Sequence, residues 1–139
     1  MSEGDQRRLV FHGAIVLLIG NLCGIPLGKA ASSGSSEAAL HAWRVAHSGL
    51  VATGVLLIAV GSALRLVGLG AAAASWLVWS LLASAYGGVL ALVLAAATGA
   101  NLFSPTAAPL DLLAFAGNVV VVVGTLIGVV LLIRGTRPT

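Results

Sequence analysis

The sequence predicts an all-α integral membrane protein, a four-helix bundle with both termini on the cytoplasmic side. Hydrophobic residues make up 59% of the 139-residue chain and charged residues only 8%, whereas soluble domains carry about 25% charged residues. A soluble domain of this size has too little interior to bury so much apolar surface. The apolar residues also form four runs, each long enough to cross a hydrocarbon core of about 30 Å. We therefore expect one multi-pass domain covering residues 1–139.

The first span is predicted at about residues 9–27. Residues 1–8 are polar and charged, which indicates a short cytosolic tail. Proline interrupts helical hydrogen bonding, so Pro26, together with Gly28 and Lys29, is predicted to end this first helix.

The second helix is predicted to start near Ala38, after a flexible loop rich in Ser and Gly. Glu37 stands where a carboxylate favours a helix N-terminus. The membrane span itself covers about residues 45–67, with the preceding turns at the interface. Residues 68–70, Gly-Leu-Gly, predict a tight turn.

The third and fourth spans are predicted at about residues 71–97 and 110–133. A loop at residues 101–109 separates them. Pro105 and Pro109 in this loop prevent one continuous helix.

The basic residues predict the orientation. Four spans place both termini on one side of the membrane. The side with the termini carries five basic residues, Arg7, Arg8, Arg65, Arg134 and Arg137. The other side carries two, Lys29 and Arg44. Because Lys and Arg collect on cytoplasmic loops, the termini are predicted to be cytoplasmic. We expect the protein in the plasma (inner) membrane. Seven basic residues are too few to indicate nucleic-acid binding.

The three histidines bear on a metal site. His12 begins the first span, whereas His41 and His47 stand at the opposite end of the bundle, so we expect most of a bilayer between His12 and His47. His41 and His47 are six residues apart on a helix and face different directions. A zinc centre commonly takes three protein ligands, and no such set is expected. A single imidazole with an open opposite face is typical of five-coordinate haem, so His47 is the candidate metal ligand. The alternative is a hydrogen-bonded interfacial histidine.

Trp43 and Arg44 lie within one turn of His47. Trp43 is interpreted as an interfacial anchor, with haem stacking as a second role. Arg44 is expected to pair with a lipid phosphate or a haem propionate. Both are candidate cofactor-binding residues.

Two further polar residues within the spans have alternative roles. Thr53 lies about 9 Å deeper than His47 on the same helix, where its hydroxyl either reaches a bound ligand or bonds its own i−4 carbonyl. Tyr86, the only tyrosine, needs a partner for its hydroxyl on another helix or on a substrate. The sequence contains no Ser/His/Asp set, carboxylate pair, phosphate loop or CxxC motif.

Several short motifs resemble those of the styrene oxide isomerase family. The most specific is a Trp four residues before the histidine of an A-H-S-G element. The motifs are Phe11-His12-Gly13, Trp43-x-x-Ala46-His47-Ser48-Gly49, Phe103-Ser104-Pro105 and Pro109-x-Asp111.

The resemblance implies an oligomeric membrane enzyme, by analogy a homotrimer, that binds ferric haem b through one axial histidine, here His47. The iron would act as a Lewis acid on a small hydrophobic aryl epoxide. A 1,2-hydride shift then gives the aldehyde, a Meinwald rearrangement without net electron transfer.

This sequence departs from the family pattern at two substrate-side positions. The family has Asn six residues after the histidine, where Thr53 stands here, and Tyr five residues before F-S-P, where Thr98 stands. Thr53, Thr98 and Tyr86 are the candidate catalytic residues, and Thr53, Thr98 and Asn101 the candidate substrate contacts. The substrate itself is left open by the sequence.

Two other functions are compatible with the sequence. One is a small membrane scaffold or assembly protein without a cofactor. The other is a haem electron carrier, which would favour two haem-ligating histidines on facing helices, a pairing that we do not expect within this chain.

Overall fold

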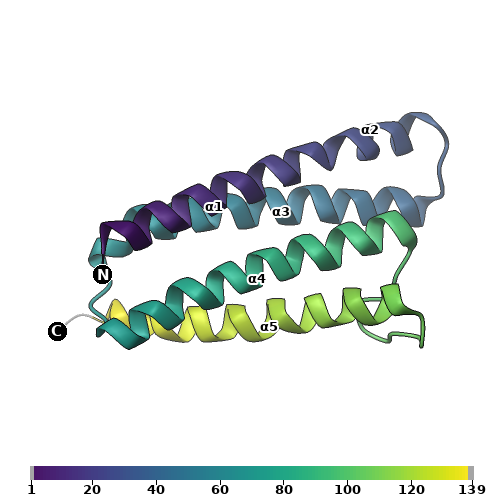
Figure 1. Ribbon diagram of the computed structural model, residues 1–139. Helices are drawn as coiled ribbons and strands as arrows, with labels where there is room; N and C mark the ends of the chain where they lie inside the picture. Colours follow the sequence, from purple (N-terminus) through teal and green to yellow (C-terminus); the bar gives the residue numbers. More distant parts are fainter. Residues whose placement is uncertain (1, 138–139) are drawn as a thin grey trace.

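The computed structural model describes residues 2–137, and these residues form helices joined by short connections (Figure 1). In chain order the elements are α1 (Glu3–Leu22), α2 (Gly24–Ser32), α3 (Glu37–Ala63), the 3-10 turn η1 (Leu64–Leu66), α4 (Ala71–Thr98) and α5 (Pro109–Gly135). No residue in the range 2–137 is in a strand, which confirms the all-α prediction. Met1, Pro138 and Thr139, the ends of the predicted domain 1–139, lie outside the described residues.

Four helical stretches are long and apolar enough to cross a membrane: Glu3–Ser32, Glu37–Leu66, Ala71–Thr98 and Pro109–Gly135. The predicted third and fourth spans lie within the last two of these stretches. The predicted second span, 45–67, ends one residue beyond η1. The chain thus has the architecture of a multi-pass membrane protein.

The first helix begins earlier than predicted. Residues 3–8, expected to be a tail, form the first turns of α1. The Ser2 hydroxyl accepts the Asp5 N–H at 3.2 Å, and the Asp5 carboxylate accepts the Ser2 N–H at 3.2 Å. This reciprocal capping box satisfies N–H groups that a helix start leaves without partners.

The prediction that Pro26, Gly28 and Lys29 end the first helix is wrong. The chain continues helically to Ser32, with one interruption at Cys23 between α1 and α2. Pro26 is the third residue of α2. Proline is tolerated in a first helical turn, because the N–H it lacks would have no helical partner there.

The helices pair as two antiparallel hairpins, α1–α2 against α3 and α4 against α5 (Figure 1). Glycines allow this close approach, as is usual between membrane helices. A Cβ added to Gly54 of α3 would lie 2.5 Å from the Leu17 nitrogen of α1, and one added to Gly124 of α5 would lie 2.6 Å from the Ser80 carbonyl of α4. Gly54 and Gly124 therefore serve helix packing.

Large aliphatic side chains fill the space between the two hairpins. Leu50 and Leu57 of α3 and Leu77 and Leu81 of α4 are all buried and belong to one hydrophobic cluster. The outward faces remain apolar and exposed, particularly along α5. A bilayer provides the apolar surroundings that such faces require.

α1 begins and α5 ends at the same end of the bundle (Figure 1). Arg7, Arg8, Arg65 and Arg134 belong to the helix termini at that end, and Lys29 and Arg44 to the opposite end. The cytoplasmic location of the termini stays a prediction from this charge distribution.

Candidate functional site

The ring of His47 makes a directed contact with the backbone of α1. Its Nδ1 lies 2.8 Å from the Gly20 carbonyl oxygen. A carbonyl only accepts hydrogen bonds, so Nδ1 must carry a proton and donate it. In the neutral ring the lone pair is then on Nε2, and this is the tautomer that binds a metal through Nε2.

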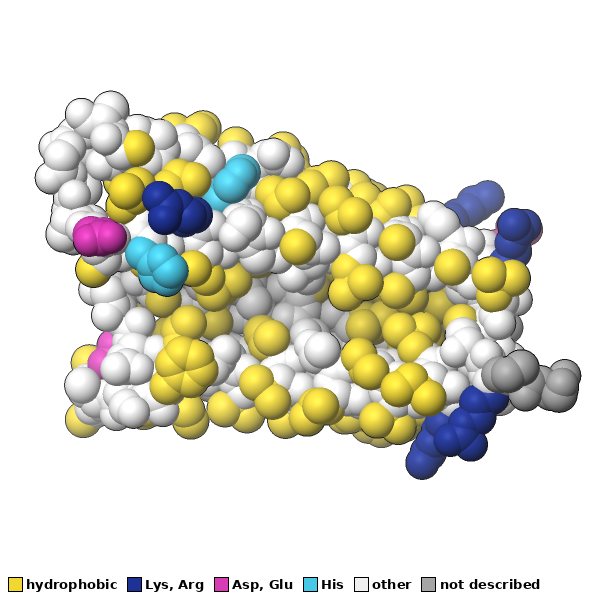
Figure 2. Space-filling view, turned by 180° about the vertical axis from the view of Figure 1, so that it is seen from behind, with side chains coloured by type: hydrophobic (Ala, Val, Ile, Leu, Met, Phe, Trp, Pro, Cys, Tyr) yellow, Lys and Arg dark blue, Asp and Glu magenta, His cyan; other side chains and the backbone are white. Residues whose placement is uncertain are grey.

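The His47 ring lies partly at the surface of the molecule, with Gly24 beside it. The ring is half-buried, and a Cβ added to Gly24 would lie 3.5 Å from its Nδ1 and Cε1 atoms. Figure 2 shows histidine side chains at the surface near the end where α2 meets α3, beside basic and acidic side chains. The hydrogen bond that the ring makes to residues 2–137 is at Nδ1, so Nε2 is not engaged by it.

The residues flanking His47 differ in exposure. Trp43 is half-buried and packs against the hydrophobic cluster, which fits the anchoring role. Arg44 and His41 are exposed, so the Arg44 guanidinium is free to meet an anionic group at this end of the bundle.

Residues 2–137 contain no group of three His, Cys, Asp or Glu side chains placed to hold a metal ion. A porphyrin supplies four nitrogen ligands itself and needs only one or two from the protein. A lone imidazole with Nδ1–H bonded to a carbonyl and Nε2 free fits haem iron in its chemistry.

Thr53 lines a different part of the molecule from His47. It faces a cavity of about 260 Å³ enclosed by α3, α4 and α5, and His47 does not line this cavity. Figure 2 shows a recess between the two hairpins on the face seen from behind. Because six residues turn a helix by about 600°, one chain directs the two side chains to different sides of α3.

The hydroxyl protons around this cavity are committed to the protein. Thr53 donates to the Gly49 carbonyl at 2.8 Å, which confirms the i−4 alternative for its hydroxyl. Ser84 of α4 donates to the Val121 carbonyl at 3.1 Å and lies 2.7 Å from the Thr125 hydroxyl, which then donates to Ser84. A ligand in the cavity would therefore meet hydroxyl lone pairs on apolar walls.

The cavity also has polar residues that the sequence does not assign to a site: Ser84, Asn118 and Thr125. All three line the cavity, and the Asn118 amide donates to the Leu102 carbonyl at 3.2 Å. Lone polar side chains in apolar helices were the available signal, but their convergence depends on the packing of α4 against α5.

Thr98 and Asn101 lie at the end of the bundle that also holds the start of α3 (Figure 1). Thr98 is exposed and donates to the Leu94 carbonyl at 2.8 Å. The Asn101 side chain accepts the N–H groups of Phe103 and Ser104, both at 2.9 Å. Both side chains thus stabilise the end of α4 and the loop that follows it.

Tyr86 is placed away from the other predicted substrate-side residues. Its hydroxyl lies 2.7 Å from Nδ1 of His12 on α1, so the partner that its hydroxyl needs is on another helix. It lies twelve residues before Thr98 on α4, about 18 Å along the helix. The structure does not bring Tyr86 together with Thr98 or Thr53.

His12 and His47 lie at different depths of the bundle. His12 precedes Gly20, the partner of His47, by eight residues on α1, which is about 12 Å along the helix axis. Gly24, whose added Cβ would lie 3.5 Å from the His47 ring, follows His12 by twelve residues, about 18 Å along the helix. The two rings are too far apart to bind one iron.

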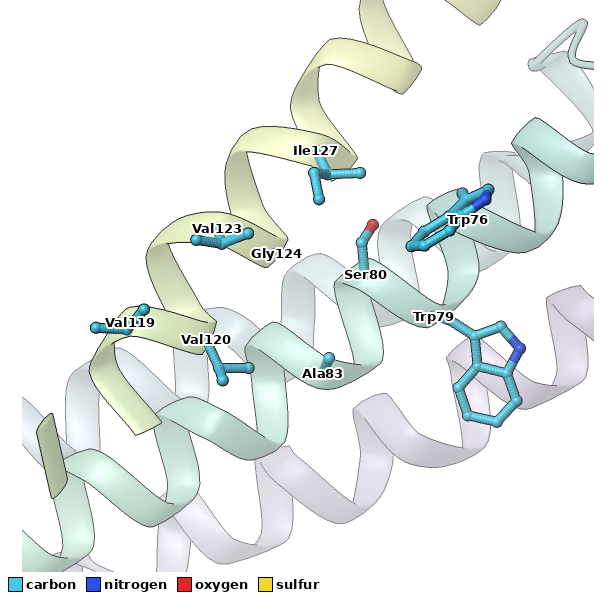
Figure 3. A pocket seen from close by; sticks show the side chains of 9 residues that line it. All are labelled: Trp76, Trp79, Ser80, Ala83, Val119, Val120, Val123, Gly124 and Ile127. Carbon is cyan, nitrogen blue, oxygen red and sulfur yellow. The ribbon is translucent and has the colours of Figure 1, made fainter. Parts of the chain in front are cut away.

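A groove of about 410 Å³ lies between α4 and α5 on the outer surface (Figure 3). Trp76 and Trp79 lie toward one end of it and aliphatic side chains form its walls. Its one polar side chain, Ser80, donates to the Leu77 carbonyl at 3.0 Å. The groove lacks chemical groups for catalysis and suits contact with lipid.

Comparison with known proteins adds the family. A family model described as styrene oxide isomerase matches residues 5–137, nearly the whole chain. No curated protein and no solved structure matches significantly. The matched region includes every candidate residue named above. The chain belongs to the styrene oxide isomerase family.

Proposed function

We propose that this protein is a membrane isomerase that converts a small hydrophobic aryl epoxide to an aldehyde, using ferric haem b bound through His47. Family membership supports an isomerase of the styrene oxide type. The single observation that supports the cofactor is the 2.8 Å contact of His47 Nδ1 with the Gly20 carbonyl, because it leaves Nε2 as a free electron-pair donor.

When bound, ferric haem supplies a Lewis acid that polarises the epoxide oxygen and weakens the benzylic C–O bond before the 1,2-hydride shift. His47 would hold the iron through the electron pair on its Nε2. The hydrogen bond to Gly20 makes that imidazole more basic and holds its plane. Trp43 packs beside the site, and Arg44 is available to pair with a propionate.

The apolar surroundings are the protein's second contribution. Water near a benzylic cation would give a diol instead of an aldehyde, so the site has to exclude it. The helix faces around His47 and the cavity beside Thr53 are walled mainly by Ala, Leu, Val and Gly. On the substrate side, Thr53 stands where the family has Asn, and Thr98 stands where it has Tyr, with Asn101 close by in the sequence. These two differences from the family support a substrate other than styrene oxide.

The half-exposed position of His47 supports a homo-oligomer. A porphyrin on the outer face of α3 would be exposed on its far side in a single chain. A second copy would cover that side. We propose a homotrimer in the plasma membrane, following the family resemblance.

Two functions of other classes remain the alternatives. A scaffold protein would need no cofactor. An electron carrier with two histidine ligands from one chain is less well supported, because His12 lies about 12 Å along the helix axis from Gly20, the partner of His47.

The absorption spectrum of the detergent-purified protein tests the proposal. We expect a Soret band that is lost in His47→Ala and kept in the control variants His12→Ala and His41→Ala. Aryl epoxides should give aldehydes without added reductant. Fully expressed protein without a Soret band would support the scaffold, and turnover that depends on an electron donor would exclude Lewis-acid catalysis.

A further inference from the structure

The interruption between α1 and α2 lies beside the site. α1 ends at Leu22, α2 begins at Gly24, and the regular helical pattern lapses at Cys23. In Figure 1 the chain passes from one helix to the next without a loop. Pro26 explains the lapse, since it has no N–H for the Leu22 carbonyl and its ring clashes with that carbonyl.

The carbonyl groups at this break have identifiable partners. The Ile19 carbonyl still accepts the Cys23 N–H at 3.0 Å, and the Asn21 carbonyl shares that N–H. Regular bonding resumes where the Cys23 carbonyl accepts the Leu27 N–H at 3.2 Å. The Gly20 carbonyl, whose helical partner would be the Gly24 N–H across the break, accepts His47 Nδ1 at 2.8 Å.

We propose that Pro26 is a positioning residue for His47. By interrupting the helix it releases the Gly20 carbonyl from the helical ladder and makes it the acceptor that fixes the Nδ1–H tautomer of the ring. In a continuous helix the Gly20 carbonyl would accept the Gly24 N–H instead. His47 would then adopt the tautomer that histidine prefers in water, with the proton on Nε2. That tautomer has no electron pair on Nε2 for a metal.

The positions of the glycines agree with this role. Gly20 lies against α3, where an added Cβ would come within 2.6 Å of the Val51 nitrogen, so α1 approaches α3 closely where the carbonyl meets the ring. Gly24, the first residue after the break, lies beside the same edge of the ring, since an added Cβ would be 3.5 Å from Nδ1 and Cε1 of His47. The Nδ1–H tautomer of His47 is a property of the chain alone, whereas its effect on haem binding rests on the proposed function.

The test is the protonation of the ring nitrogens in the full chain without haem. Histidine labelled with ¹⁵N, in detergent at about pH 8, above the ordinary imidazole pKa of about 6.5, gives separate shifts for protonated and unprotonated nitrogens, and His47→Ala assigns them. We expect a protonated Nδ1 and an unprotonated Nε2 at His47. Pro26→Ala restores an N–H at position 26, and the proton should then move toward Nε2.

The matched control is Pro109→Ala, which removes a proline from the first position of α5, where the missing N–H has no helical partner. It should leave the His47 shifts unchanged. If Pro26→Ala does not fold, Pro26→Gly restores the same N–H without a Cβ. Equal shifts in wild type and both Pro26 variants would overturn the proposal.

A second measurement uses haem itself. If His47 binds haem, Pro26→Ala should weaken haem binding about 10- to 100-fold, as loss of a ligand's hydrogen-bond partner does, and should raise the midpoint potential because the imidazole becomes a weaker donor. Haem bound through His47 with unchanged affinity and potential in Pro26→Ala would contradict the positioning role. A wild-type chain that has the Nδ1–H tautomer but takes up no haem would refute the proposed function and leave the positioning role intact.

Discussion

His12 of α1 and Tyr86 of α4 are joined by a hydrogen bond of 2.7 Å, with their rings edge to face at a centroid distance of 5.6 Å. Within residues 2–137 this is the only side-chain hydrogen bond between the α1–α3 hairpin and the α4–α5 hairpin. On the same two helices the Arg8 guanidinium lies 5.3 Å from the Trp79 ring. These polar contacts join the hairpins on the side of α1 and α4, whereas the cavity beside Thr53 lies between α3, α4 and α5.

Tyr86→Phe should therefore lower stability without affecting haem. The change removes the hydroxyl and keeps the ring, so the expected loss is about 0.6 kcal/mol, the mean for such bonds between membrane helices. Reversible unfolding in mixed detergent would measure it. A double-mutant cycle with His12→Ala should give a coupling energy of similar size. An unchanged stability together with loss of turnover would instead assign the Tyr86 hydroxyl to the substrate, as the sequence prediction allowed.

Gly54→Ala should destabilise the first hairpin. Its Cβ would lie 2.5 Å from the Leu17 nitrogen and 2.7 Å from the Leu17 Cα, backbone atoms that move only with the whole of α1, and such overpacking costs about 1 to 3 kcal/mol. Thermal unfolding of the detergent-solubilised protein would show the loss.

Gly28→Ala is the matched control for this glycine. It is also helical, but an added Cβ there meets no atom within 4 Å. Alanine favours helix over glycine, so this variant should be as stable as wild type or slightly more so. Equal destabilisation of both variants would show that helix packing is not the reason for Gly54.

Thr53→Val should change turnover of an aryl epoxide by less than about threefold, or about 0.7 kcal/mol. The Thr53 proton is already donated to the Gly49 carbonyl, and an epoxide oxygen has no proton to offer in return. Valine keeps the shape of the side chain. Steady-state kcat/KM for aldehyde formation is the measurement.

Thr53→Asn provides the comparison for that variant. It introduces an amide donor at the position where the family has Asn, so turnover of styrene oxide should rise relative to wild type. A loss of tenfold or more in Thr53→Val would contradict this reasoning, because it would mean that the hydroxyl leaves Gly49 to serve the substrate.

Reporter fusions test the orientation. A reporter that is active only in the cytoplasm should be active when fused after Arg137 or before α1, because the basic residues at those helix ends favour the cytoplasmic side. The same reporter inserted in loop 33–36, between α2 and α3, should be inactive. The opposite pattern would show that the termini lie on the side of the membrane away from the cytoplasm.

The first helix shows where local sequence reasoning fails. Pro26 disrupts the regular helix, as its missing N–H predicts. A proline can, however, either end a helix or lie in the first turn of the next one, and the local sequence does not distinguish these outcomes. The packing of residues 24–32 against α3 favours continuation. The break then falls at Cys23, one turn before the proline.

The sequence by itself determined the number of apolar spans, because hydropathy acts locally, and it indicated the family, because the family motifs lie close together in the chain. Only the tertiary structure decided the partners of the polar side chains. His47 meets a carbonyl 27 residues away and His12 a hydroxyl 74 residues away. Such contacts depend on how each helix is rotated and how deep it lies relative to its neighbour. The apolar side chains around each helix have nearly equal hydropathy, so the sequence does not specify this rotation or depth, and only packing of the helices does.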